Sequence, residues 1–286
     1  MREVFTKTIL NKHKKRDSWF LDDYSLNPYQ LCEFNCIYCY IKGSRYGEKK
    51  DKLAVKINAP TLLEKELYRR AKKKEYGFIA LSSATEPWME AERRYRVTRK
   101  CLEIIARYKF PVHCLTKSPL ILRDLDLLCE INENAVLPSD LGELGCGSLI
   151  TFSFSTLDEK IAKIFEPNAP RPIDRLKTIE KIKDYGFYCG IAYIPVLPFI
   201  SDHNEQLDEM IRVAGELADY VFVGALTLHG VGKQLYFRVL EKHFPELIPK
   251  YERLYKFNQS SREYQKKLEK LAIELCKKHG VKYMIR

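Results

Sequence analysis

Short apolar runs alternate with longer segments along most of the chain, and the two kinds of segment differ in periodicity. The runs are almost continuously apolar, which is typical of strands buried on both faces of a parallel sheet. The longer segments repeat apolar residues every three or four positions, as amphipathic helices do. Strands are therefore predicted over residues 77–83, 111–116, 149–155, 187–195 and 220–228, with an earlier one within 19–29.

Helices are predicted between these strands. Residues 58–74 form one, with Asn58 as a candidate N-cap and Pro60 just inside the helix. Residues 90–108 form a second helix, whose apolar positions share one face. That face comprises Val97, Cys101, Ile104, Ile105 and Tyr108. Further helices are predicted over residues 174–186, with Gly186 as a candidate C-cap, and over residues 203–218.

The alternation of strand and helix, repeated about six times, predicts an α/β fold with a parallel sheet curled into a partial (β/α)6 barrel and helices outside it. We assign this barrel to residues 20–230. Residues 1–19 are expected to form a basic N-terminal segment, and residues 231–286 a helical C-terminal extension packed on the barrel. In such barrels, chemistry takes place at the carboxyl ends of the strands.

Composition narrows the class of protein. Of the 286 residues, 45% are hydrophobic and 30% are charged, which fits a globular protein with a core. No apolar run reaches the length of about 18 residues that a membrane-spanning helix needs, and the first 20 residues do not resemble a secretory signal. Nine cysteines in a chain with no export signal are expected to be reduced thiols in a cytoplasm.

The formal net charge is +11, and it is unevenly distributed. Residues 42–74 contain 12 Lys and Arg against 4 Asp and Glu. A basic stretch of this kind can attract the phosphates of a nucleic acid. The alternative is a solvated surface rich in charged residues, as in heat-adapted proteins.

Three cysteines lie within eight positions of one another, in the pattern C-x3-C-x2-C formed by Cys32, Cys36 and Cys39. Thiolates suit zinc or an iron–sulfur cluster. A structural zinc site needs four ligands, and no fourth Cys or His follows at the required spacing. A 4Fe–4S cluster held by three thiolates leaves one iron open to a substrate or cofactor, which accounts for the missing ligand.

With its surrounding segments, this pattern resembles the radical S-adenosylmethionine (SAM) superfamily, and within it the branch that contains spore photoproduct lyase. The resemblance spans most of the chain and rests on "LNPYQLCEFNCIYCY", "VKINAP", "TKSPLILRDLDLL" and "FEPNAPRPIDRL". It implies a 4Fe–4S cluster that reductively cleaves SAM to a 5′-deoxyadenosyl radical, which abstracts hydrogen from a substrate. It also implies an external one-electron reductant such as ferredoxin or flavodoxin.

Several side chains are expected to contact SAM. By resemblance, Tyr38 lies near the adenine, and Thr85 and Glu86 hold the methionine amine. Glu86 has an alternative role as a cap of the following helix. Lys117, directly after a predicted strand, is a candidate partner of the SAM carboxylate rather than a solvated surface lysine.

Ser153 and Ser155 alternate on one face of a predicted strand, where they can bond the SAM ribose or simply fill a tight interior. Glu166 and Arg175 are expected to brace each other across the Pro-rich loop that follows, and Arg123 and Asp124 to pair at a helix start. His229 is interpreted as a structural residue, with a substrate role as the alternative.

The substrate is less well defined than the chemistry. Spore photoproduct lyases carry a hydrogen-donating cysteine at the end of the second strand, where this chain has Ser83, Ala84 and Thr85. The leading hypothesis is a nucleic-acid base. The second is a small metabolite or protein side chain, and the third is a zinc or iron–sulfur binding module without catalysis.

Overall fold

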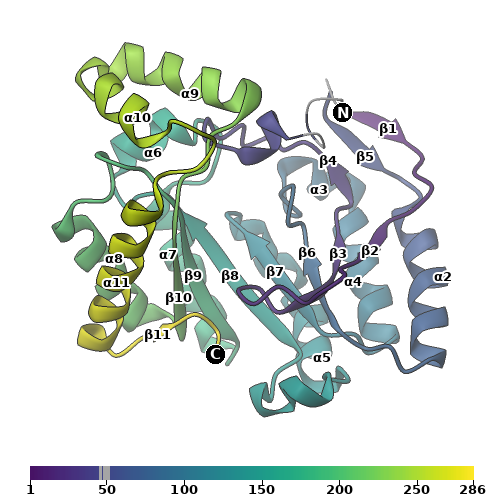
Figure 1. Cartoon of the computed structure of the whole chain (residues 1–286). Coiled ribbons are helices and arrows are strands. Elements are labelled where there is room, and N and C mark those ends of the chain that lie inside the picture. Colours follow the sequence, from purple (N-terminus) through teal and green to yellow (C-terminus); the bar gives the residue numbers. More distant parts are fainter. Residues whose placement is uncertain (45–46, 48–51) are drawn as a thin grey trace. The chain divides into compact units, whose positions relative to one another are not determined.

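The computed structural model describes residues 1–44, 47 and 52–286. The chain divides into two compact units (Figure 1). The first unit comprises residues 1–33, 52–151 and 180–189, and the second comprises residues 34–51, 152–179 and 190–286. Strand β8 (Ser148–Phe154) contributes its first residues to the first unit and its last residues to the second.

Parallel strands form the centre of the first unit. Strands β3 (Asp22–Leu26), β6 (Phe78–Leu81) and β7 (Val112–Thr116) pair in that order, and the start of β8 follows. Strand β2 (Leu10–Lys12) pairs antiparallel with β3. All four residues of β6 are buried, because helices cover the faces of a parallel sheet.

The helices of this unit follow the strands in sequence. They are α2 (Ala59–Lys72), α3 (Glu90–Tyr95), α4 (Val97–Arg107) and α5 (Leu125–Asn134), with the 3₁₀ helices η2 (Pro119–Asp124) and η3 (Ser139–Leu144). A second, small sheet has the order β1 (Arg2–Val4), β5 (Ala54–Lys56) and β4 (Tyr29–Gln30).

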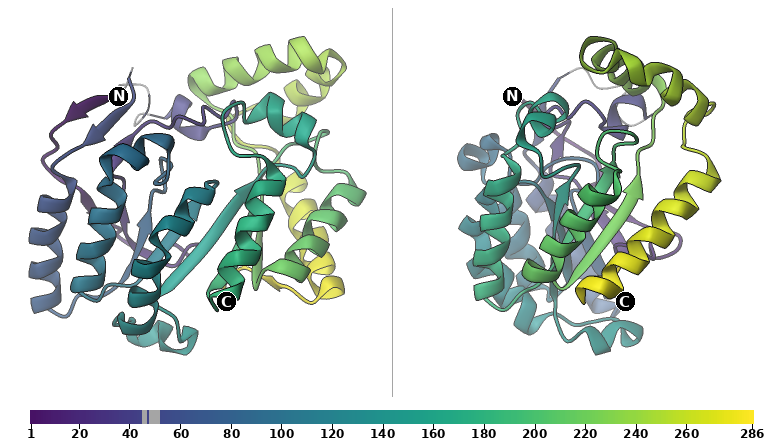
Figure 2. Two further views of the ribbon diagram at one scale, coloured as in Figure 1. Left: turned by 180° about the vertical axis from the view of Figure 1, so that it is seen from behind. Right: turned by 90° about the vertical axis from the view of Figure 1, so that its left-hand side faces the viewer.

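The second unit repeats the parallel pattern. The end of β8 is followed by β9 (Tyr188–Val196), β10 (Tyr220–Ala225) and β11 (Lys282–Tyr283). Helices α6 (Glu159–Phe165), α8 (Asn204–Leu217), α9 (Gly230–His243), α10 (Ile248–Leu254) and α11 (Arg262–His279) belong to it, as does most of α7 (Pro172–Asp184). Two 3₁₀ helices, η1 (Tyr40–Gly43) and η4 (Pro245–Leu247), also belong to it. Helix α11 packs along α8 and β10 (Figure 2).

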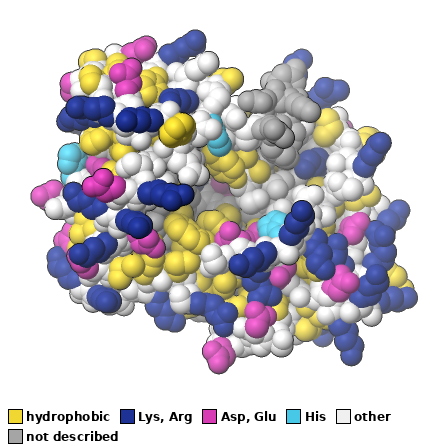
Figure 3. Space-filling view, viewed as in Figure 1, with side chains coloured by type: hydrophobic (Ala, Val, Ile, Leu, Met, Phe, Trp, Pro, Cys, Tyr) yellow, Lys and Arg dark blue, Asp and Glu magenta, His cyan; other side chains and the backbone are white. Residues whose placement is uncertain are grey.

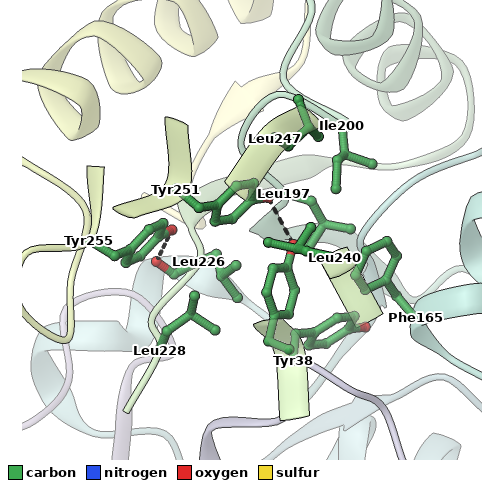
Figure 4. Packing of buried hydrophobic residues seen from close by; sticks show 11 residues of the cluster. Tyr38, Phe165, Leu197, Ile200, Leu226, Leu228, Leu240, Leu247, Tyr251 and Tyr255 are labelled. Atoms are coloured by element: carbon green, nitrogen blue, oxygen red, sulfur yellow. Dashed lines mark hydrogen bonds between the residues drawn. The ribbon is translucent and has the colours of Figure 1, made fainter. Parts of the chain in front are cut away.

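A cluster of buried aromatic and aliphatic side chains forms the core around α9 and α10 (Figure 4). Its tyrosines satisfy their hydroxyl groups internally, as buried phenols require. The hydroxyl of Tyr251 donates to the carbonyl oxygen of Pro198 at 2.6 Å, and that of Tyr255 donates to the carbonyl oxygen of Leu226 at 2.8 Å. Tyr38 joins this cluster from the cysteine-containing loop.

The α/β fold class and the six predicted strands are confirmed. The described strands form an open order from β2 to β11 and no closed barrel. The predicted single helix over residues 90–108 is wrong, because Arg96 adopts a left-handed conformation with φ 50° and separates α3 from α4. Asn58 occupies the N-cap position of α2, as predicted, but its side chain makes no capping hydrogen bond. It exchanges two hydrogen bonds with the backbone of Thr6 instead.

Candidate active site

The cysteine-containing segment begins in the first unit. Strand β4 ends at Gln30, and Leu31 turns the chain through a left-handed conformation with φ 60° before Cys32. The backbone N–H of Glu33 contacts the sulfur of Met89 at 3.2 Å. The carboxylate of Glu33 accepts from the backbone N–H of Ala91 at 3.3 Å, so it satisfies a donor in the first turn of α3.

The other two cysteines of the motif, Cys36 and Cys39, belong to the second unit. We call residues 34–39 the cysteine loop. The backbone N–H of Ile37 donates to the carbonyl oxygen of Phe165 at 2.8 Å. The backbone N–H of Asn168 donates to the carbonyl oxygen of Phe34 at 3.3 Å. These two bonds join the cysteine loop to the end of α6 and to the segment that follows it. Cys36 packs against the apolar cluster. All three cysteines of the motif, Cys32, Cys36 and Cys39, are partly exposed.

Tyr38 points into the apolar cluster (Figure 4), and its hydroxyl donates to the carboxylate of Glu166. Glu166 also accepts from the hydroxyl of Ser155 at 2.9 Å and from the guanidinium of Arg175. The side chains of Glu166 and Arg175 are each 1% exposed, so the predicted brace between them is confirmed as a buried ion pair. Burial, followed by the Glu166 carboxylate, raises the pKa of Tyr38, which keeps its phenol protonated.

Arg175 is itself held from several sides. It donates to the carbonyl oxygen of Ser153 at 2.9 Å and to that of Pro170 at 2.9 Å. The hydroxyl of Ser153 donates to the carbonyl oxygen of Ile194 at 3.1 Å. The end of β8, the Pro-rich loop and α7 are thus joined through Glu166 and Arg175 in a single polar network.

In the first unit, Glu86 follows the carboxyl end of β6 and is 5% exposed. Its carboxylate accepts from the hydroxyl of Thr116 at 2.6 Å, and from the backbone N–H groups of Lys117 at 3.0 Å and Trp88 at 3.1 Å. Burial raises the pKa of Glu86, although these donors and the Lys117 ammonium oppose the shift. The helix-capping alternative is wrong, because Met89 occupies the N-cap position of α3.

Thr85 lies beside Glu86 and is partly buried; its hydroxyl is 3.5 Å from the side-chain oxygen of Asn27. That oxygen also accepts from the backbone N–H of Ala84 at 3.0 Å, which ties the loop after β6 to the end of β3. The ends of β6 and β7 therefore bring Thr85, Glu86 and Lys117 together within the first unit. Their contacts with SAM stay a prediction.

Sequence reasoning did not identify the charged network behind Glu86. The indole N–H of Trp88 donates to the carboxylate of Asp124 at 2.8 Å. Asp124 also accepts from Arg123 at 2.6 Å, as predicted, and from Arg99 at 3.0 Å. Asp124 is fully buried, so these donors compensate its charge and fix the loop that contains Glu86 and Trp88. No sequence motif signals a contact between α4, η2 and this loop.

Only part of the basic stretch 42–74 lies within the described residues. Arg45, Lys49 and Lys50 lie outside the described residues. The last turn of α2 carries Arg69, Arg70 and Lys72, and it leads into the amino end of β6, opposite to the end that carries Glu86. The Lys and Arg side chains visible on one face are interspersed with acidic and apolar ones (Figure 3).

The donor set of the cysteine segment fits an iron–sulfur cluster, since three thiols at short spacing are soft ligands and each is partly exposed. Cys32 belongs to the first unit, and Cys36 and Cys39 belong to the second. As the side chains stand, no three His, Cys, Asp or Glu residues of the described ranges converge on a metal position.

Comparison with known proteins identifies the family. The model of the Radical SAM superfamily matches residues 26–214, which is more than half of the chain. The chain therefore belongs to the radical SAM superfamily and is an enzyme, and SAM and a 4Fe–4S cluster are the cofactors of that family. The third hypothesis, a binding module without catalysis, is thereby set aside.

A relative and two solved structures are similar to this chain over most of its length. An uncharacterized protein of Mycobacterium tuberculosis (strain ATCC 25618 / H37Rv) is 29% identical over 262 residues, which cover 89% of this chain and 73% of that protein. A mutant of spore photoproduct lyase has a similar fold, with a TM-score of 0.71 and 15% identity over 97% of this chain and 78% of that one. SuiB of Streptococcus suis bound to S-adenosylmethionine has a TM-score of 0.50 and 18% identity, covering 79% of this chain and 47% of that one.

Among the described helices, none is both long and apolar enough to cross a membrane.

Proposed function

We propose that Cys32, Cys36 and Cys39 hold a 4Fe–4S cluster through three of its irons and leave the fourth iron to SAM. The observation that carries this proposal is the C-x3-C-x2-C spacing of partly exposed thiols in a segment that lies within the family match. When bound and reduced, this cluster supplies the electron that cleaves SAM and generates the radical that takes hydrogen from the substrate.

The ends of β6 and β7 are proposed to bind the amino-acid part of SAM. Glu86 offers a carboxylate and Lys117 an ammonium group, and the backbone of Lys117 bonds the Glu86 carboxylate directly. Methionine carries one positive and one negative group on the same carbon, so this adjacent pair of opposite charges is complementary to it. Thr85 adds a hydroxyl beside Glu86.

In the second unit, Tyr38 is proposed to lie near the adenine, and Ser153 and Ser155 to bond the ribose hydroxyls. Both serine hydroxyls already donate within the protein, to Ile194 and Glu166 respectively. A serine hydroxyl can both donate and accept, so a ribose hydroxyl is a suitable donor to it. The proposed contact therefore has the serines as acceptors and the ribose as donor.

We propose a nucleic-acid base as the substrate and an external reductant such as ferredoxin or flavodoxin, in a reducing cytoplasm. Support comes from the net charge of +11 and from the similar fold of a spore photoproduct lyase mutant with bound AdoMet and dinucleoside spore photoproduct. The serine and threonine at the end of β6, where those lyases have a cysteine, argue against the same lesion-repair reaction. A small metabolite or protein side chain is the rival, since SuiB is bound to precursor peptide SuiA in its structure.

The substrate class is testable by fluorescence anisotropy with labelled single-stranded RNA, single-stranded DNA and duplex DNA. We expect binding at about 50 mM salt that weakens linearly on a log–log plot up to about 200 mM, because phosphate contacts release counterions. The variant Arg69→Ala/Lys72→Ala is the control, since these residues lie in the last turn of α2, which leads into the amino end of β6, and their loss should leave affinity nearly unchanged. No binding of any of the three at low salt would rule out a nucleic-acid substrate.

A further inference from the structure

The four residues from Phe165 to Asn168 contact the cysteine loop at three points on both sides of Cys36. The backbone N–H of Asn168 bonds the carbonyl of Phe34, and the backbone N–H of Ile37 bonds the carbonyl of Phe165. The third contact is the bond from the hydroxyl of Tyr38 to Glu166. We call residues 165–168 the bracket segment. All of these residues belong to the second unit.

Glu166 is the polar centre of the bracket segment. Its partners come from three different places in the chain: Tyr38 in the cysteine loop, Ser155 just after β8, and Arg175 in α7. The carboxylate and the guanidinium are both buried, and each compensates the charge of the other. The position of Glu166 is thus fixed independently of the cysteine loop, and Tyr38 binds to this fixed point.

Tyr38 differs from the other tyrosines of the apolar cluster in its partner. The hydroxyl groups of Tyr236 and Tyr251 bond each other at 2.8 Å, and Tyr255 bonds a backbone carbonyl. Tyr38 bonds a carboxylate, and hydrogen bonds to charged groups are the stronger kind. A phenylalanine ring at position 38 would fill the same apolar space. The hydroxyl of Tyr38 therefore has a role beyond packing.

We propose that Glu166 is a positioning residue for the cofactor site, which acts through Tyr38 and the backbone of the bracket segment to hold Cys36 and Cys39 in place. This inference rests on the proposed function, in which these cysteines are cluster ligands. A ligand loop with less conformational freedom releases iron more slowly, because the thiolates remain close to the cluster when one bond opens. The bracket segment therefore controls the lifetime and the environment of the 4Fe–4S cluster.

The test compares two substitutions that each remove one buried phenol hydroxyl from the same apolar cluster. Tyr38→Phe breaks the bond to Glu166, and the matched control Tyr236→Phe breaks the bond to Tyr251. The anaerobically reconstituted holoenzymes are mixed with a ferrous chelator, and the rate of iron loss is followed by absorbance. Electron paramagnetic resonance spectra of the reduced proteins are recorded with and without SAM.

We expect Tyr38→Phe to lose iron about tenfold faster than wild type, the change that corresponds to one hydrogen bond to a charged group, and to show an altered spectrum. Tyr236→Phe should match wild type in both measurements, although both variants lower thermal stability. Ser155→Ala, which removes a second donor to Glu166 and leaves Tyr38 intact, should give an intermediate rate.

Equal rates of iron loss in Tyr38→Phe and Tyr236→Phe would overturn the inference, because a role in stability alone affects both variants alike. That result would leave the proposed function intact. If wild type binds no 4Fe–4S cluster, or Cys36→Ala retains one, the ligand assignment itself is wrong and the inference fails with it.

Discussion

The backbone N–H of Ile37 donates to the carbonyl oxygen of Phe165 at 2.8 Å and thereby joins the cysteine loop to the end of α6. This bond makes the proposed ligand loop part of the folded second unit rather than an independent segment. Substitutions near either residue should therefore affect the cofactor as well as the fold.

Removal of one proposed ligand should remove the cluster. We expect Cys36→Ala to lose most of its iron, because two thiolates cannot hold the cluster. The broad absorption at about 400 nm that thiolate-ligated iron gives should be lost with it. Cys101→Ala is the matched control, since Cys101 is fully buried in α4. Iron and sulfide analysis after reconstitution checks both. Full iron content in Cys36→Ala would refute the ligand assignment.

The buried carboxylate of Glu86 should be important for the stability of the fold as well as for the proposed binding of SAM. Glu86→Ala leaves the hydroxyl of Thr116 and the backbone N–H groups of Lys117 and Trp88 without their acceptor. We expect a loss of about 2–4 kcal/mol in the free energy of unfolding, from urea titration. Glu90→Ala, at an exposed residue of α3, should cost less than about 0.5 kcal/mol. Equal costs would show that Glu86 is not held as described.

Gly43 has no room for a side chain. A Cβ atom there would lie 1.8 Å from the carbonyl oxygen of His229, so η1 and the start of α9 could no longer approach each other. We expect Gly43→Ala to destabilise the protein by about 1–3 kcal/mol and to lower iron retention, because η1 directly follows Cys39. Gly142→Ala is the control, since nothing lies within 4 Å of its added Cβ. Unchanged melting in Gly43→Ala would contradict this packing.

His113 predicts a pH dependence of stability. Its ring is fully buried, with contacts to the carbonyl of Phe20 at 2.8 Å and the hydroxyl of Thr151 at 2.6 Å. Burial lowers the pKa of His113 to about 4, so the unfolded chain binds a proton at higher pH than the folded one does.

The stability that neutral His113 supports is thus present above about pH 6.5 and is lost as the pH falls toward 4, by about 3 kcal/mol in all. In the variant His113→Gln, about one fewer proton should be taken up on unfolding in this window, so the plot of unfolding free energy against pH should be less steep. Urea denaturation at several pH values measures it, and an unaltered slope in the variant would assign the dependence to other groups.

The sequence predicts the strands well; β6, for example, is continuously apolar and is followed by a turn. It predicts the Glu166–Arg175 pair because both residues flank one short Pro-rich loop. The break at Arg96 is missed, since an arginine gives no signal of left-handed backbone. The bond between Tyr38 and Glu166 is also missed, because it joins residues 128 positions apart through tertiary packing alone.

The charge pattern of residues 42–74 did not predict where its basic side chains lie in the fold. Residues 42–74 are adjacent in sequence, but α2 places its basic end at the amino end of β6. Net charge along a segment does not determine which end of a helix faces a site. Three cysteines within eight residues indicate a candidate ligand set, but the structure does not bring their side chains together, so the ligand assignment stays a prediction.

Reductive cleavage of SAM would show most directly that Cys32, Cys36 and Cys39 form a catalytic cluster site. The protein is reconstituted anaerobically with iron and sulfide, reduced with dithionite and incubated with SAM, and the products are separated by chromatography. We expect 5′-deoxyadenosine from wild type and none above background from Cys36→Ala. A wild-type protein with a confirmed, reducible 4Fe–4S cluster that forms no more 5′-deoxyadenosine than Cys36→Ala would contradict this expectation.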